Sequence, residues 1–142
     1  MRISDVIRRK GDLVVTVRSD VTVHRLLELL EEHRIGALVV SDDGSTVSGI
    51  VSERDVVRHL RTAGAGVLDQ TVATIMTSDV QTCTPDDGIE DLARTMTDRR
   101  IRHIPVVVDG RLRAIVSIGD IVKWRIDELQ TERDQLVGYI QQ

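Results

Sequence analysis

Two nine-residue stretches decide the fold: GIVSERDVV at residues 49–57 and AIVSIGDIV at residues 114–122. Each begins with a β-branched apolar run that suits a strand. Each continues into Ser-x-x-Asp, a pattern typical of a helix start. The serine and the aspartate are kept in both copies, whereas the two residues between them change completely. This recurrence indicates an internal duplication.

The two halves of the chain align when the sequence is shifted against itself. At an offset of 66 residues Thr16 meets Thr82 and Leu26 meets Leu92, and at an offset of 65 residues Ser52 meets Ser117 and Asp55 meets Asp120. The duplication predicts a first repeat at residues 1–62, a linker at 63–71, a second repeat at 72–126 and a C-terminal helix extension at 127–142. The linker contains the glycines of TAGAG (62–66), which predict a flexible connection.

Both repeats show the same order of predicted elements: helix, strand, helix, strand, strand, helix. Val23, Leu26 and Leu30 recur at helical spacing, as do their counterparts in the second half. Extended segments are predicted at LVVTV (13–17) and VQTCT (80–84). Asp-Gly between two β-rich runs predicts a hairpin in each half. The fold class is therefore α/β (α+β), with two pseudo-twofold-related repeats and a helical extension.

Composition narrows the class of protein. The 142 residues are 41% hydrophobic and 30% charged, which suits a soluble globular core, and the net charge of −4 argues against non-specific nucleic-acid binding. No apolar run approaches the roughly 18 residues of a membrane span. Cys83 is the single cysteine, so no intramolecular disulfide can form. We expect a cytoplasmic protein without nucleic-acid or membrane partners.

The sequence also lacks the usual motifs of catalysis. There is no Gly-x-Ser-x-Gly nucleophile motif and no His-Glu-x-x-His or paired His and carboxylate spacing for a metal. We therefore expect no enzymatic activity, no metal and no catalytic cofactor.

The order of elements, the pairing of HRIGALVV with GIVSERDVV and of RIRHIPVV with AIVSIGDIV, and Met76-Thr77 resemble two tandem CBS domains, which together form a Bateman module. The resemblance covers roughly residues 1 to 126 and implies a stand-alone regulatory CBS pair. Such modules bind adenosine-containing ligands (AMP, ADP, ATP, NAD(H) or S-adenosylmethionine) in clefts between the repeats, and some act in energy sensing.

The resemblance implies that the motif aspartates, Asp55 and Asp120, accept hydrogen bonds from ribose hydroxyls. Ser52 and Ser117 would stand beside them at the helix N-termini, where a phosphate is also favoured. The other interpretation is a capping box, in which the serine and the acidic residue satisfy the first backbone N–H groups of the helix. Both roles remain open from the sequence.

Further binding residues are implied by the same resemblance. Arg102 and His103 correspond to basic residues that contact phosphates in the family, and they could serve either cleft or simply form a solvated basic patch. The first repeat has Gly36 and Ala37 at these positions, which predicts two unequal clefts. The stretches that match the adenine-binding segments contain Val14, Thr77, Val80, Ile35 and Gly36.

The tail carries an apolar stripe on a predicted long helix. Its members have a 4-3 spacing and are Val122, Ile126, Leu129, Leu136 and Ile140, with Arg133 at the intervening position. The stripe would either fold back on its own module or cover a second copy, and we expect a homodimer.

The sequence thus predicts a ligand-sensing module whose state is recognised by an unidentified protein target. The alternative is a structural or protein-interaction module with clefts that no longer bind.

Overall fold

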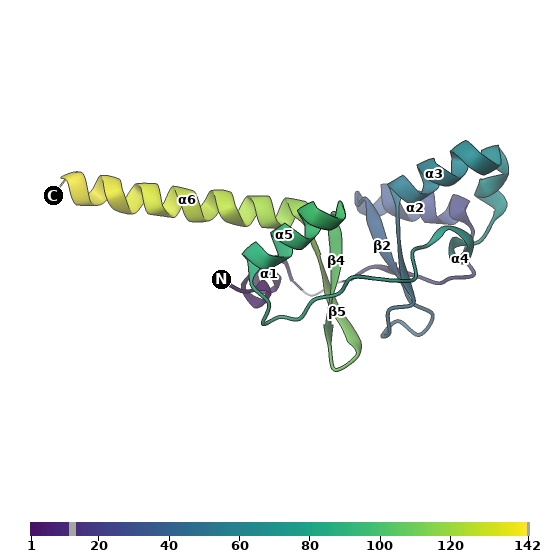
Figure 1. Cartoon of the computed structure of the whole chain (residues 1–142), viewed down its shortest axis with the longest axis horizontal. Coiled ribbons are helices and arrows are strands. Elements are labelled where there is room, and N and C mark those ends of the chain that lie inside the picture. Colours follow the sequence, from purple (N-terminus) through teal and green to yellow (C-terminus); the bar gives the residue numbers. More distant parts are fainter. Residues whose placement is uncertain (12–13, 142) are drawn as a thin grey trace.

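The computed structural model describes residues 1–11 and 14–141, and it places two small α+β halves next to each other (Figure 1). In chain order the elements are α1 (Ile3–Lys10), β1 (Thr16–Val17), α2 (Val23–His33), β2 (Ala37–Val40), β3 (Gly49–Ser52), α3 (Glu53–Ala63), η1 (Gly64–Asp69), α4 (Val72–Ile75), α5 (Ile89–Arg99), β4 (His103–Val108), β5 (Arg111–Ser117) and α6 (Ile118–Gln141). The predicted fold class is confirmed.

Each half is organised around a short sheet. In the first half β1 pairs with β2 in parallel and β2 pairs with β3 antiparallel, whereas in the second half β4 and β5 form an antiparallel hairpin. Asp109 and Gly110 at the tip of this hairpin have φ values of 52° and 76°. Two successive positive φ values define the type I′ turn that Asp-Gly favours, so the predicted hairpin forms.

The strand predicted at residues 80–84 does not form, which is a difference between the repeats. Cys83 makes a single parallel bridge to Val106, equivalent to the pairing of Val17 with Val40 in the first half. Pro105 stands where the first repeat has Val39. A proline has no N–H to donate, so the next bond of the ladder cannot be made and the pairing stops after one residue.

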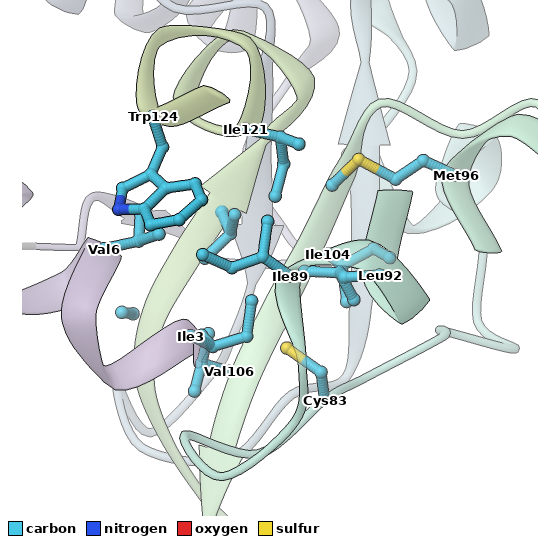
Figure 2. Packing of buried hydrophobic residues seen from close by; sticks show 12 residues of the cluster. Ile3, Val6, Cys83, Ile89, Leu92, Met96, Ile104, Val106, Ile121 and Trp124 are labelled. Atoms are coloured by element: carbon cyan, nitrogen blue, oxygen red, sulfur yellow. The ribbon is translucent and has the colours of Figure 1, made fainter. Parts of the chain in front are cut away.

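The short helices that begin the repeats are exchanged between the two halves. The side chains of Ile3 and Val6 from α1 are buried among residues of the second repeat, including Ile89 and Trp124 (Figure 2). Val72 and Ile75 of α4 are buried in the core of the first repeat. The boundaries of the sequence repeats therefore differ from those of the packed cores, because each core contains a helix from the other repeat.

Backbone hydrogen bonds fix this exchange on both sides. The N–H of Ile3 donates to the carbonyl of Asp87 at 2.9 Å, and the N–H of Val72 donates to the carbonyl of Val21 at 2.8 Å. The predicted flexible connection is also wrong: residues 64–69 form the 3₁₀ helix η1, and Val67 is fully buried in the first core. The connection is ordered because it has an apolar side chain to bury.

Among the described residues of the last helix, α6, buried side chains occur only near its start. Ile121 and Trp124 pack into the second core, whereas the rest of the helix projects away from the body (Figure 1). The stripe predicted from the sequence is exposed, with Leu136 at 63% and Ile140 at 79% of their full accessibility. The stripe therefore does not fold back on its own chain. None of the helices that the structure describes combines the length and the apolar composition that a membrane span requires.

Candidate functional site

The two Ser-x-x-Asp motifs occupy equivalent places in the two halves. Each serine ends a strand, β3 or β5, and each aspartate lies in the first turn of the helix that follows, α3 or α6. The N–H of Ser52 donates to Oδ2 of Asp55 at 2.8 Å, and the N–H of Ser117 donates to Oδ2 of Asp120 at 2.9 Å. We call the surroundings of the two carboxylates the Asp55 site and the Asp120 site.

Both motifs form capping boxes, so the capping interpretation is confirmed. The N–H of each aspartate donates back to the serine Oγ, at 3.4 Å for Asp55 and 3.2 Å for Asp120. Each serine hydroxyl also donates to Oδ2 of its aspartate. Within the part of the chain that the structure describes, Oδ1 of neither aspartate accepts a hydrogen bond. One oxygen of each carboxylate thus serves the cap, and the other remains available to a ligand.

Lys10, a residue that the sequence analysis missed, distinguishes the two sites. Its Nζ lies 2.7 Å from Oδ2 of Asp120 and 2.8 Å from the carbonyl oxygen of Ile115, to both of which it donates. The exposed fractions of the two side chains are 35% for Lys10 and 22% for Asp120, so water partly screens this pair. The ammonium belongs to α1, which is part of the first repeat in sequence but packs into the core of the second repeat.

The electrostatics of Asp120 reflect this neighbour. Burial by itself would raise the pKa of the Asp120 carboxyl. The hydrogen bonds from Lys10 and from the N–H of Ser117 outweigh burial, so the pKa lies below its ordinary value. Asp120 is therefore ionised at neutral pH and keeps the acceptor-only character that binding of hydroxyl donors requires.

His103 lies where the two repeats meet. A Cβ added to Gly36 would lie 3.7 Å from Cε1 of His103 and 3.9 Å from the carboxylate of Glu53, so this glycine of the first repeat faces the second. Burial lowers the pKa of His103, nearby Lys10 lowers it further, and the charges of Asp120 and Glu53 partly offset these effects. The imidazole is thus neutral at neutral pH and shares its neighbourhood with Lys10 and Asp120.

The remaining predicted binding residues are more dispersed. Arg102 is exposed, and its carbonyl accepts the first N–H of α6, from Ile118, at 2.8 Å. Within the described residues its side chain makes no hydrogen bond or ion pair. Ile35 is half-buried against the first core, whereas Val14 is half-buried against the second. Residues 12 and 13, which belong to the predicted adenine-binding stretch, lie outside the described residues.

Thr77 is attached to the Asp55 half of the molecule. The N–H and carbonyl of Thr77 pair with the backbone of Ile50 in β3, both at 2.9 Å. A Cβ on Gly49 would come within 2.9 Å of the Thr77 carbonyl oxygen, so the glycine permits this close approach. Val80 is half-buried. The segment after α4 is therefore attached to the strand that leads into the Asp55 motif.

Two pockets lie around α1. One of about 130 Å³ lies between α1 and α6 and is lined in part by Asp120. The other, of about 570 Å³, lies on a different face of α1 beside Pro85, Val108 and Arg113. The second pocket has the size of a small-molecule site, but it contains no Ser-x-x-Asp residue.

The single cysteine, Cys83, is poorly suited to act as a nucleophile. The Cys83 thiol is buried in the second core. Burial raises its pKa to about 12, so the thiol is protonated at neutral pH and is not a nucleophile.

Comparisons with known proteins identify the family. The CBS domain pattern matches residues 3–62 and again residues 72–127. The chain therefore belongs to the CBS domain family and carries two copies of the domain. Its architecture is that of a tandem CBS pair, as the resemblance in the sequence indicated.

Individual relatives agree with this assignment. The mitochondrial CBS domain-containing protein CBSX3 of Arabidopsis thaliana is 36% identical over 98% of this chain and 71% of its own length. The crystal structure of the CBS-domain containing protein ATU1752 from Agrobacterium tumefaciens superposes with a TM-score of 0.85 and 44% identity, over 88% of this chain and 99% of that one. The CBS domain pair of protein MJ0100, solved with 5′-methylthioadenosine and S-adenosyl-L-methionine, is 25% identical with a TM-score of 0.77, over 87% of this chain and 98% of that one.

Proposed function

We propose that this protein is a regulatory, non-enzymatic module that binds an adenosine-containing ligand between its two CBS repeats. The observation that carries the proposal is the unused Oδ1 of Asp55 and Asp120, which stays open although both capping boxes are complete. Support also comes from the MJ0100 pair, which was solved with two adenosine derivatives.

The chemistry of the free oxygens suits a ribose. Asp55 is only 9% exposed, so its carboxylate has lost most of its water and gains from an added donor. An ionised carboxylate oxygen accepts hydrogen bonds from vicinal hydroxyls, and hydrogen bonds to charged groups are stronger than neutral ones. We expect AMP, ADP, ATP or NAD(H) as ligands, besides the methylthioadenosine class.

Regulation would follow from a shift between arrangements of the two halves. A ligand held by residues of both repeats favours the arrangement that makes both sets of contacts. The exchanged helices α1 and α4 pass such a change from one half to the other, because each is packed into the core of the opposite repeat. A target protein would bind selectively to the resulting arrangement.

Thermal unfolding with candidate ligands tests the proposed function. At a ligand concentration one hundred times the Kd, binding stabilises the fold by about 2.7 kcal/mol. We expect the unfolding midpoint to rise by several degrees with at least one of AMP, ATP, NADH and S-adenosylmethionine. Inosine serves as the control with the same ribose and a different base. Unchanged midpoints with all four ligands would favour the structural module with non-binding clefts.

We also propose that the protein is a homodimer in which α6 contributes to the interface. Pairing two copies of the exposed stripe would remove its apolar side chains from water. Parallel pairing would place Arg133 against the same residue of the partner, whereas antiparallel pairing places it against an apolar position. The stripe therefore favours an antiparallel arrangement of the two helices.

Charged substitutions in the stripe test the dimer. Replacing Leu129 and Leu136 together by aspartate should shift the mass measured by light scattering from dimer to monomer, because each new charge would have to be desolvated at the interface. Replacing Gln130 and Gln135 by aspartate is the matched control, since both lie off the stripe and should leave the mass unchanged. A stripe variant that stays dimeric at low micromolar concentration would remove α6 from the interface.

A further inference from the structure

Lys10 brings a positive charge to one of the two motif carboxylates and not to the other. Its ammonium forms an ion pair with Asp120 at 2.7 Å. Within the described residues, no lysine, arginine or histidine side chain forms an ion pair with Asp55. The two sites are equivalent in backbone and capping geometry but differ in charge.

The lengths of the exchanged helices explain this difference. Helix α1 has eight residues and ends at Lys10, whereas α4 has four residues and ends at Ile75. In the second half the carbonyl of Ile115 accepts the Lys10 ammonium. The equivalent carbonyl in the first half, that of Ile50, accepts the backbone N–H of Thr77 instead. Because α1 is about one turn longer than α4, the Lys10 ammonium in the second half takes the place that the backbone N–H of Thr77 has in the first half.

The ammonium also lines the pocket of about 130 Å³ between α1 and α6. Its charged lining residues are Arg9, Lys10, Lys123, Asp120 and Asp127. Three of these residues are cations and two are carboxylates, and Arg9 pairs with Asp127 at 3.1 Å, so the lining has a net formal charge of +1. Typical small-molecule sites measure roughly 300–1,000 Å³, so this volume suits a single small group and not a whole nucleotide.

We propose that Lys10 and this pocket form a phosphate subsite, which makes the Asp120 site selective for adenosine ligands that carry a phosphate. The proposal rests on the proposed function, since it assigns a ligand class to one of its two sites. An ammonium has three N–H donors, and two of them are used by Asp120 and Ile115. The third can donate to a phosphate oxygen without breaking either bond, while Oδ1 of Asp120 stays open to the ribose.

Calorimetric titration with AMP and with adenosine tests the subsite. The titrations use the full chain with Asp55→Asn, so that they report the Asp120 site. Adding Lys10→Met should weaken AMP binding roughly tenfold or more, because a charge-assisted hydrogen bond to phosphate is lost. Adenosine binding should change less than about twofold, since it has no phosphate. Lys10→Arg keeps the charge and should retain most of the preference for AMP.

Arg8→Met is the matched control, because Arg8 lies on the same helix, its side chain is 77% exposed and it does not line this pocket. It should leave the affinities for both ligands unchanged. Equal weakening of AMP and adenosine by Lys10→Met, or no weakening of either, would overturn the phosphate subsite. If the unmodified protein binds neither AMP nor adenosine but is stabilised by S-adenosylmethionine, the phosphate subsite is overturned and the proposed function stands. If none of the ligands binds, the proposed function itself fails. If a melting curve shows that Lys10→Met does not fold, Lys10→Gln replaces it, because glutamine removes the charge but keeps a polar side chain, and the same selective loss of AMP affinity is expected.

Discussion

Replacing Ile3 by alanine is expected to lower the free energy of unfolding by about 2–5 kcal/mol, the usual cost of truncating a buried isoleucine. The Ile3 side chain is completely buried, in a core otherwise built from residues 83–124 and Val6. The truncation removes apolar contacts and leaves a cavity between α1 and the second sheet. Equilibrium unfolding in urea measures the loss, which is a large part of the 5–15 kcal/mol that holds a typical domain together.

Ile7→Ala is the matched control for this prediction. Ile7 lies one turn further along α1 and is only half-buried against the same core, so its truncation should cost clearly less. Similar small losses from both variants would contradict the packing of α1 into the second repeat. The control separates core packing from a general effect on the helix, because both substitutions replace isoleucine by a better helix former.

Replacing Asp55 by asparagine is expected to weaken the binding of an adenosine ligand in that site by roughly 1.5–3 kcal/mol, the range for hydrogen bonds to a charged group. Asparagine keeps the size of the side chain but has one acceptor oxygen in place of two. That oxygen is needed by the cap, so the ribose loses its acceptor. Calorimetric titration of the variant with AMP and adenosine measures the change in affinity.

Thermal stability without ligand provides the control. Asparagine is an acceptable residue near a helix start, so the cap of α3 should lose less than about 1 kcal/mol. Asp120→Asn is the paired variant, and it should lose more stability because the substitution also removes the partner of Lys10. If Asp55→Asn lowers the melting midpoint but keeps the affinity, the motif is only a cap.

Several features of the fold could be predicted from particular residues. Asp109-Gly110 specifies its hairpin because few other residue pairs adopt two positive φ values at low cost. The exchange of α1 and α4 could not be predicted, since the apolar face of a short helix does not say which sheet it covers. The absence of a strand at Cys83 could have been predicted, because Pro105 lacks the backbone N–H that Val39 has at the equivalent position of the first repeat.

The candidate site, too, could be predicted only in part from the sequence. The duplicated serine and aspartate predict two equivalent capped helix starts, and both are present. Lys10 escaped notice because its role depends on the exchange of α1 and on a long-range contact with Asp120, 110 residues further along the chain. The projection of α6 could not be foreseen either, since an apolar stripe shows that a surface is to be covered but not by which partner.

The exchange of α1 also fixes the timing of folding during synthesis. The core that α1 completes ends with Trp124, which leaves the ribosome 114 residues after Lys10 (124 − 10). At a synthesis rate of roughly 5–20 residues per second, on the order of ten seconds pass between the synthesis of α1 and that of the last residues of the core into which it packs. The first repeat, by contrast, can close as soon as α4 emerges. We therefore expect nascent chains in which the first repeat has folded while α1 still lacks the core of the second repeat, so that Ile3 and Val6 are accessible to chaperones.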